Sequence, residues 1–541
     1  MGIGTTAKWL TCVAVWTAAV AVARGGDWPQ WGRTNSRNMV SEERGLPDSF
    51  TLDDRHAPPA DAPPINGTVR WEVRLGSQTY GNPTVAGGRV FVGTNDASLS
   101  DPRLRRSGGG LLMCIEEATG RLLWRLHCPR RIERERPDLG LDRMKLGICS
   151  SPTVDGDRLY VVSNRAEVLC LDVRGMADGN DGPFTDEAAY MTGEADPRCR
   201  LRLTDGDILW RRDLVADRVS WPHDAANSAV LVCGELLYVC TSNGMDRKHR
   251  HVPFPDAPSL IALDKRTGRI LAGDDRRIGT RLLGGQWSSP AMGRVAGRPL
   301  ILFGGGDGVC YGFRPPSASG NGPPAPLPLA WAFDCNPPDY RERDGRPVRY
   351  RSSTGPSEII ATPVFHDGRV YVATGQDPRH GKGRGALSCI DATTGRAVWV
   401  NRDVNRSLST VAIDGGLLYL ADLAGTLHCI EAATGRSCWT HDLGCPVWSS
   451  PLVADGKVYI GTAGRRLWIL RAGRAKQVIH CIRLPDPMYN SPVAANGVLY
   501  LATQRRLFAV QRTRHLAAGK PESPGRFHRA LILKGHKDPR R

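Results

Sequence analysis

One segment of the chain concentrates oxygen ligands of the kind that bind calcium. In "ADGNDGPFTDE", residues 177–187, such side chains recur at short spacing: Asp178, Asn180, Asp181, Asp186 and Glu187. Hard oxygen donors of this type suit Ca²⁺, although their spacing does not reproduce an EF-hand loop. Asp and Asn also cap turns. We therefore expect a hydrogen-bonded surface insertion, with a structural calcium site as the alternative, and assign no metal ligand.

A second group of polar residues has the types that proton transfer requires. His223 and Asp224 are neighbours, and Glu358 and Arg406 stand at comparable places elsewhere in the chain. A His-Asp pair together with a further acid can move protons. Ordinary hydrogen bonding within loops explains the same residues, and we expect that role. No catalytic residue is assigned.

Signatures of several other chemistries are missing from the sequence. "GQDPRHGKGRG", residues 375–385, imitates a phosphate-binding loop, but its glycine spacing is wrong and no Ser or Thr follows Lys382. There is no Gly-x-Ser-x-Gly elbow and no His-Glu-x-x-His zinc motif. We therefore predict neither a nucleotide site nor a known hydrolase, and no specific nucleic-acid partner.

The elements that carry these residues come from one repeated unit. The phrase "MCIEEATGRLLW" at 113–124 recurs as "SCIDATTGRAVW" at 388–399 and as "HCIEAATGRSCW" at 428–439. The cleanest unit, 408–444, has four short β-rich runs separated by glycine-containing turns, which is typical of an antiparallel meander. Such a unit is one propeller blade, whose Trp is expected to pack against a neighbouring blade.

Comparable inner-strand starts recur eight times. They are "NPTV" (82), "SSPTV" (150), "NSAVLV" (227), "SSPAM" (288), "ATPVF" (361), "LSTVA" (408), "SSPLV" (449) and "NSPVA" (490). The last unit lacks a Trp strand, whereas "GTVRWEVRLGS" at 67–77 carries one and precedes the first unit. We expect this strand to complete the last blade and leave no open sheet edge. The predicted fold is all-β, an eight-bladed β-propeller of four-stranded antiparallel blades closed by an N-terminal strand.

Loop lengths predict which face of the propeller carries function. The first-to-second turns are tight, whereas most long connections emerge on the opposite face, and loops decorated on one side of a rigid scaffold usually mark recognition. Symmetry places a set of residues around the mouth of the central channel on this loop-rich face: Tyr80, His223, Asp224, Trp287, Glu358, Arg406, Trp448 and Tyr489. The aromatic members could stack on a planar ligand or anchor a peptide, and an inner packing layer is the alternative.

Cysteine positions follow the repeat. Of the 15 cysteines, Cys114, Cys389 and Cys429 precede the motif carboxylate by two residues, and Cys170 stands in the same relation to Asp172. We expect these to be small buried strand residues. Others lie outside that register and could pair, with the connectivity left open: Cys128, Cys149, Cys199, Cys335, Cys445 and Cys481.

The termini predict export. The proposed segments are a signal peptide at 1–23, an N-terminal extension at 24–66, the propeller at 67–510 and a basic tail at 511–541. The first segment has a lysine, an apolar run too short to span a bilayer and a small-residue end, so we expect a periplasmic or extracellular protein. No transmembrane segment is expected in the mature chain. The net charge of +17 is partly in the tail, which we expect to be solvated, with contact to an anionic surface as the alternative.

The phrase "CIDATTGRAVW" resembles the tryptophan-docking repeat of the pyrroloquinoline-quinone-type propellers over roughly residues 67–510. That family includes quinoprotein alcohol dehydrogenases and a lipoprotein of the outer-membrane β-barrel assembly machinery. The resemblance implies, for a dehydrogenase, a bound quinone, a calcium ion, a catalytic Asp and a disulfide between adjacent cysteines. This chain has no Cys-Cys dipeptide and no Cys-x-x-Cys-His haem sequence, so no cofactor-binding residue is carried over.

These observations predict a non-catalytic exported propeller, a monomer that binds a protein, glycan or small ligand on its loop-rich face. A role in envelope assembly fits this expectation. The alternative is a divergent quinone-dependent oxidoreductase that uses pyrroloquinoline quinone and calcium, and a polyanion-binding protein is a third hypothesis. The same fold carries enzymes and scaffolds, so the site must decide between them.

Overall fold

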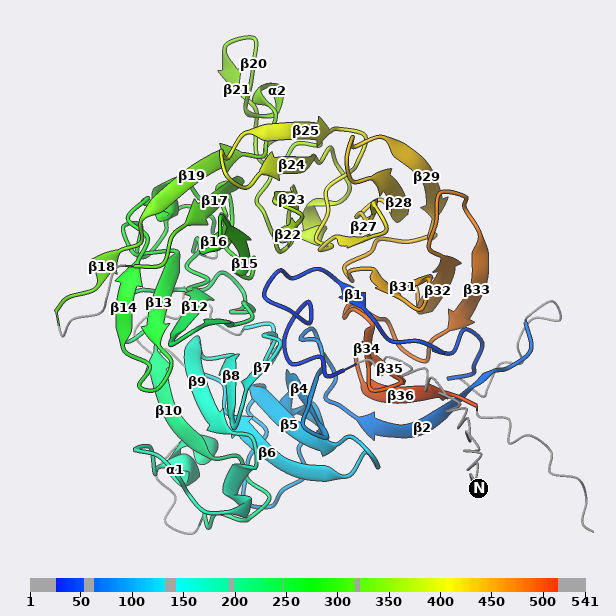
Figure 1. Cartoon of the computed structure of the whole chain (residues 1–541). Helices are drawn as coiled ribbons and strands as arrows, with labels where there is room; N and C mark the ends of the chain where they lie inside the picture. The colour runs from blue at the N-terminus through cyan, green and yellow to red at the C-terminus, as the bar shows by residue number, and fades with distance from the viewer. Residues whose placement is uncertain are drawn as a thin grey trace, which may run out of the picture.

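The computed structural model of the 541-residue chain describes residues 26–52, 63–131, 143–193, 199–246, 248–316 and 322–513. The predicted signal peptide and nearly all of the predicted basic tail lie outside the described residues. In these ranges, eight antiparallel sheets follow one another around a central axis (Figure 1). The predicted eight-bladed propeller is therefore confirmed.

The first four blades are consecutive four-stranded meanders. Blade one contains β3 (Thr84–Ala86), β4 (Arg89–Asn95), β5 (Gly110–Glu116) and β6 (Leu122–Cys128). Blade two contains β7 (Thr153–Asp155), β8 (Arg158–Val162), β9 (Glu167–Asp172) and β10 (Ile208–Asp213). Blade three contains β11 (Leu231–Cys233), β12 (Leu236–Cys240), β13 (Leu260–Asp264) and β14 (Ile270–Gly273). Blade four contains β15 (Ala291–Val295), β16 (Arg298–Gly304), β17 (Val309–Phe313) and β19 (Leu329–Asp334).

The next three blades repeat this order. Blade five contains β22 (Val364–His366), β23 (Arg369–Ala373), β24 (Leu387–Asp391) and β25 (Ala397–Asn401). Blade six contains β26 (Ala412–Asp414), β27 (Leu417–Ala421), β28 (Thr426–Glu431) and β29 (Ser437–Asp442). Blade seven contains β30 (Leu452–Ala454), β31 (Lys457–Gly461), β32 (Arg466–Arg471) and β33 (Val478–Arg483).

Smaller elements decorate these sheets. Two short strands pair in parallel with a blade edge, β1 (Val40–Ser41) on β30 and β18 (Ala325–Pro326) on β14. A hairpin of β20 (Glu342–Arg343) and β21 (Arg346–Pro347) projects from the rim beside α2 (Pro338–Arg341) (Figure 1). The remaining helical turns are η1 (Asp96–Ser98), η2 (Gly175–Ala177), α1 (Glu187–Thr192), η3 (Ile278–Arg281) and η4 (Pro378–His380).

Blade eight takes its outer strand from the other end of the chain. It contains β34 (Val493–Ala495), β35 (Val498–Ala502) and β36 (Arg506–Arg512), which pairs antiparallel with β2 (Gly67–Arg74). Trp71 of β2 lies opposite Ala509, at the position that Trp439 holds in blade six. The predicted closure by an N-terminal strand is confirmed, and it pairs an outer edge that would otherwise be open.

The repeated phrase builds the contact between blades. The indole N–H of Trp331 donates to the carbonyl of Ala392 in the next blade at 2.9 Å, and Trp439 donates to Gly473 in the same way at 2.9 Å. Trp71, Trp124, Trp210 and Trp399 make equivalent bonds. Ala272 stands at the Trp position of blade three. The cysteines of the phrase, Cys114, Cys170, Cys389 and Cys429, are fully buried, as predicted.

Residues 28–41 form a strap that contacts the inner strand of every blade. Their backbone carbonyls accept from Val85, Val154, Met292, Phe365 and Val453, the inner strands of blades one, two, four, five and seven. Side chains complete the circuit, because Asn35 donates to Val232, Asn38 pairs with both backbone groups of Ile413, and Ser41 donates to Ala494. In Figure 1 the strap crosses the centre of the ring ahead of β1.

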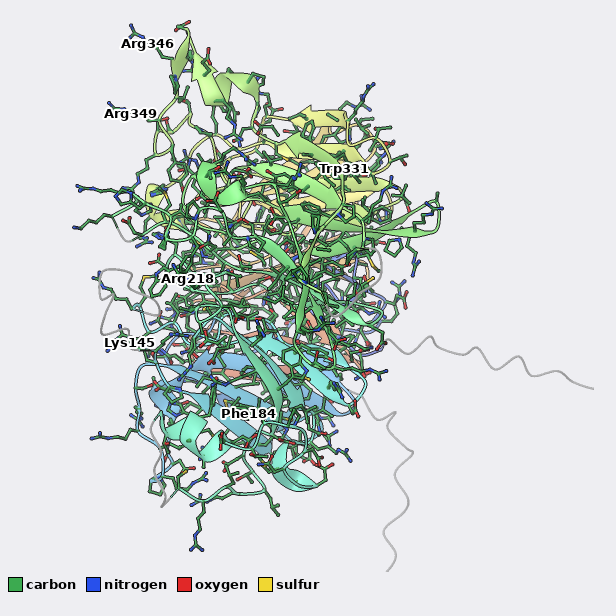
Figure 2. The ribbon with its side chains drawn as sticks, turned by 90° about the vertical axis from the view of Figure 1, so that its left-hand side faces the viewer. Lys145, Phe184, Arg218, Trp331, Arg346 and Arg349 are labelled. Carbon is green, nitrogen blue, oxygen red and sulfur yellow. The ribbon has the colours of Figure 1, made fainter. Side chains whose placement is uncertain are left out.

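The other face of the ring carries the longer connections. Lys145, Arg218 and Arg349 belong to three of the links between blades, and Figure 2 shows them along one side of the molecule. The strap contacts residues next to the tight first-to-second turns, so it covers the opposite face. One end of the central channel is therefore closed by the chain itself, and the other is open to ligands.

Candidate functional site

The wall of the central channel is a ring of short polar side chains. In several blades the residue before the inner strand accepts a hydrogen bond from the backbone N–H of its counterpart in the preceding blade. Six such bonds of 2.6 to 3.1 Å run from Asn82 to Ser151, Ala229 to Ser289, Thr362 to Thr410, Thr410 to Ser450, Ser450 to Ser491, and Ser491 back to Asn82. Ala229 has no side-chain acceptor, which interrupts the ring at blade three. These bonds tie the inner strands of neighbouring blades to one another.

Above this ring lies a cavity of about 650 Å³, which we call the cup. Its base is Trp31 of the strap, whose indole N–H donates to the Thr362 hydroxyl at 3.0 Å and whose ring is nearly fully buried. Beside it, the buried Arg37 donates to the carbonyls of Val230 and Pro290 at 3.0 Å. The cup is thus a blind pocket that opens on the loop-rich face, and its volume suits a small ligand.

Three aromatic rings form one wall of the cup. Tyr80 stacks on Tyr489 and Trp448 with ring centroids 5.7 and 6.0 Å apart, and Trp448 lies 4.6 Å from Tyr489. All three are half-buried, so each still offers a face or an edge to the cavity. Burial raises the pKa of the Tyr80 phenol well above its usual value, which keeps this wall uncharged. Trp287, from blade four, lines the same cavity.

The charged groups of the cup pair with one another. Arg379 Nη2 lies 2.6 Å from Asp224 Oδ2 and 2.5 Å from Asp377 Oδ2, and all three residues line the cavity. Burial opposes ionisation of Asp377, but hydrogen bonds from Arg379 outweigh it and lower the pKa of the carboxyl. The rim therefore has two carboxylates that a single guanidinium bridges, beside an otherwise neutral lining.

Three residues predicted at the channel mouth lie behind the wall of the cup instead. His223 is buried, with Nδ1 3.0 Å from the Met245 carbonyl oxygen and its ring 5.9 Å from Trp287. Glu358 and Arg406 are fully buried and are not among the lining residues. The reason is local, because loop backbone and hydroxyl groups bind their polar atoms and draw them inward. The other five predicted residues, Tyr80, Asp224, Trp287, Trp448 and Tyr489, line the cup.

Glu358 has the most perturbed environment of these residues. Its Oε1 accepts the Tyr350 hydroxyl at 2.5 Å, and its Oε2 is buried without a hydrogen-bond partner. Burial raises the pKa of Glu358 to about 8. Arg406 donates instead to the backbone carbonyl of Ser352. Glu358 is thus held as a neutral acid inside the loop layer, away from a ligand in the cup.

Sequence reasoning missed part of the site. Asp377 and Arg379 come from "GQDPRHGKGRG", in which the sequence alone identifies no binding residue, and Trp31 comes from the N-terminal extension. The ring of polar residues had a readable signal, since Asn, Ser or Thr precedes most of the inner strands. No such signal marked Trp31, because its place depends on how the strap crosses the ring.

Comparisons with known proteins agree with this architecture. The family described as outer membrane protein assembly factor BamB matches residues 103–180, 331–422 and 383–513. No curated protein matches the chain. BamB from Moraxella catarrhalis is similar in structure, with 14% identity, a TM-score of 0.50, and coverage of 83% of this chain and 98% of that one. A likeness at this identity shows the fold alone.

Solved dehydrogenases share the fold as well. A europium-containing methanol dehydrogenase is 11% identical with a TM-score of 0.55, and the match covers 90% of this chain and 98% of that one. A quinohemoprotein alcohol dehydrogenase from Comamonas testosteroni is 12% identical with a TM-score of 0.56, covering 92% and 83%. Among the described helices of this chain, none has the length and apolar character needed to cross a membrane.

Proposed function

We propose that this protein, a β-propeller built from repeats of the pyrroloquinoline-quinone type, is an exported non-catalytic binding or scaffold protein. The cup on its loop-rich face is the recognition site. The observation that carries this proposal is the wall of stacked rings, Tyr80, Trp448 and Tyr489, in a blind pocket of about 650 Å³. The family match to an outer-membrane assembly factor supports a periplasmic protein with a protein or glycan partner.

The lining defines the chemistry of the ligand. Half-buried aromatic faces favour flat apolar groups, while the hydroxyl and amide groups around Asn82, Thr410 and Ser491 can bind polar substituents. Among the described residues of the lining, the charged side chains are Asp224, Asp377 and Arg379, and they are already paired. The cup therefore suits a neutral ring-bearing group, either a sugar ring of a glycan or an aromatic side chain of a protein partner.

The alternative is a divergent quinone-dependent oxidoreductase. Bound quinone would supply two-electron redox chemistry, and the Tyr80 and Trp448 faces suit a planar ring. Its calcium ion would require free carboxylates in the cup, yet Asp224 and Asp377 both bind Arg379. His223 and Glu358 are buried behind the wall and could not exchange protons directly with a substrate there. The donor set does not fit this cofactor pair.

A titration that follows tryptophan fluorescence tests the proposal. The probes are an N-acetylglucosamine tetramer, a cellotetraose, a Trp-containing extended peptide, and pyrroloquinoline quinone with and without calcium. We expect saturable binding of an oligosaccharide or the peptide, weakened by about 10-fold or more in Trp448→Ala, because central aromatic contacts dominate binding energy. Trp468→Ala is the matched control, since Trp468 is half-buried in blade seven outside the cup.

The outcomes separate the two functions. Binding of the oligosaccharides or the peptide that Trp448→Ala leaves unchanged would rule out the cup as their site. Stoichiometric, calcium-dependent binding of the quinone would favour the oxidoreductase and justify assays with alcohols. If none of the probes binds at concentrations up to about 1 mM, the cup is not a site for these classes of ligand.

A further inference from the structure

The acidic insertion of blade two packs between two blades at the outer rim. It follows β9 and returns to β10, and its residues Thr204 and Gly206 bond to both backbone groups of Arg125 in β6 of blade one at 3.0 and 2.8 Å. Helix α1 of the insertion lies against β6 at the edge of the ring (Figure 1), and Figure 2 places Phe184 in the same region. The insertion is therefore part of the folded rim and joins blade one to blade two.

Three carboxylates of this region converge on one point. Oxygens of Asp172, Asp178 and Asp181 all lie within 4.8 Å of one another. Two oxygens that bind one calcium ion at about 2.4 Å each can be at most about 4.8 Å apart. The separation therefore fits ligands of a single cation. Asp172 is buried at the end of β9, whereas Asp178 and Asp181 lie in the loop above it.

A fourth carboxylate supplies independent evidence for a missing ligand. Asp207 is completely buried, and its Oδ1 has no hydrogen-bond partner. Its Oδ2 accepts the backbone N–H of Asp181 at 3.0 Å, and its backbone carbonyl accepts that of Asp172 at 3.1 Å, so the carboxyl group lies against the loop that carries the cluster. A buried carboxylate oxygen without a partner is costly, and a cation bound by the neighbouring cluster would offset its charge.

The surrounding charges are not balanced. Glu187 is also fully buried, and its Oε2 accepts from the Asn180 amide at 3.0 Å. Burial first, and then the charges of Glu187, Asp172 and Asp181, raise the pKa of Asp207 to about 7. Among the described residues, Arg174 is the only cation that forms an ion pair with these acids, and its side chain is half exposed. Five carboxylates thus share one guanidinium.

We infer that this insertion binds one calcium ion, with Asp172, Asp178 and Asp181 as carboxylate ligands and the buried Asp207 carboxyl beside them. Hard, charged oxygen donors on an irregular loop favour Ca²⁺ over softer metals, and over Mg²⁺, which demands a stricter geometry. The ion would lie at the rim of blade two, with Glu187 and Asn180 supporting the loop around it. Because none of these residues lines the cup, the inference does not depend on the proposed function.

Calorimetric titration of the EDTA-treated full chain with calcium chloride tests this site. We expect one calcium ion per chain and a rise in Tm of about 3 °C at saturating calcium, because a ligand that binds only the folded state stabilises it. Asp178→Asn and Asp181→Asn should each weaken binding by about 10-fold or more. Without calcium, Asp207→Asn should melt no lower than the wild type, since it removes an uncompensated buried charge.

Two controls make the result specific. Asp186→Asn changes an exposed carboxylate of the same segment outside the cluster and should bind calcium normally. Asp224→Asn changes the cup and should also have no effect, which separates this site from any quinone-linked calcium. No heat and no shift in Tm at about 1 mM calcium, or binding that survives both cluster variants, would overturn the inference. Equal affinity for magnesium would overturn the assignment to calcium.

Discussion

The glycine of each Thr-Gly pair is the place where one blade receives the tryptophan of the blade before it. A Cβ atom added to Gly395 would lie 2.4 Å from the Trp331 Cβ, and one added to Gly435 would lie 2.6 Å from the Trp399 ring. Gly395 also has a φ of +69°, in the left-handed region. The carboxylate of the phrase holds this turn, since Asp391 Oδ1 accepts the N–H groups of Thr393 and Thr394. The position of the glycine in each repeat is therefore fixed by the tryptophan of the preceding blade, which packs against it.

Replacing this glycine should cost more than backbone strain alone. We expect Gly395→Ala to lower the free energy of unfolding by about 2 to 4 kcal/mol, because it combines a left-handed φ with a clash in a packed interface. Gly368→Ala is the matched control, with a φ of +71° and nothing within 4 Å of its added Cβ, and should cost only about 1 kcal/mol. Equal losses in urea denaturation would show that docking does not require glycine.

At the scale of elements, the strap forms an extra layer over the face of the ring that carries the tight first-to-second turns. Its backbone and side chains bond to inner strands of all eight blades, and Asn38 imitates a strand by both donating to and accepting from Ile413 at 2.9 and 2.8 Å. Because the inner strands are short, these bonds add substantially to their pairing. The strap also supplies Trp31, the base of the cup.

Removing the strap should loosen the centre of the ring while its closure survives. In a variant that lacks residues 26–46, β2 is still present to pair with β36. We expect faster hydrogen exchange at inner strands such as β7, β22 and β26, since their backbone groups lose partners, and little change in the outer strands. Exchange measured by mass spectrometry would check this. Unchanged protection of the inner strands would mean that the strap is only a passive cover.

At the scale of the whole molecule, closure couples the two ends of the chain. The pairing of β2 with β36 joins residues separated by more than 400 positions, as in the contact between Thr68 and Gln511. A ring closed in this way has no unpaired terminal blade from which unfolding can begin. We therefore treat unfolding of the described propeller as one event to which buried groups in any blade contribute.

Glu358 should make the stability of this ring depend on pH. Its pKa is about 8 in the folded chain against an ordinary value of 4.5, so between these values the folded state holds one more proton than the unfolded state. The free energy of unfolding then falls as pH rises through this window, by up to about 1.4 kcal/mol per pH unit, and its contribution levels off above pH 8.

The substitution Glu358→Gln replaces the titratable carboxyl group with a neutral amide and keeps an oxygen that can accept the hydrogen bond from the Tyr350 hydroxyl. We expect the variant to gain stability relative to the wild type between about pH 5 and pH 8, measured as urea midpoints at both pH values. Glu342→Gln, which changes an exposed glutamate, should follow the wild type. A parallel response of Glu358→Gln and wild type would mean that the buried carboxyl does not hold its proton.

Much of the architecture could be predicted because the chain contains several copies of the same sequence pattern. Blade number, the closing strand, the buried cysteines and the resemblance to quinone-type propellers are confirmed, and all of them depend on patterns that recur from blade to blade. Aromatic positions such as Tyr80 and Trp448 followed from the same symmetry. His223, Glu358 and Arg406 did not, because symmetry locates a backbone position and not the direction in which a loop side chain turns.

The sequence by itself determined the repeated blade, the number of blades and the way the ring closes, since local turn chemistry and hydrophobic alternation recur in each blade. Only the tertiary structure decided that residues 28–41 cross the ring, that Trp31 closes the cup, and that Arg379 bridges two aspartates. The tertiary structure also places the Asp207 carboxyl group against the backbone N–H of Asp181 in the acidic insertion. These contacts join segments far apart in the chain that follow no common pattern, so packing and charge in the folded state select them.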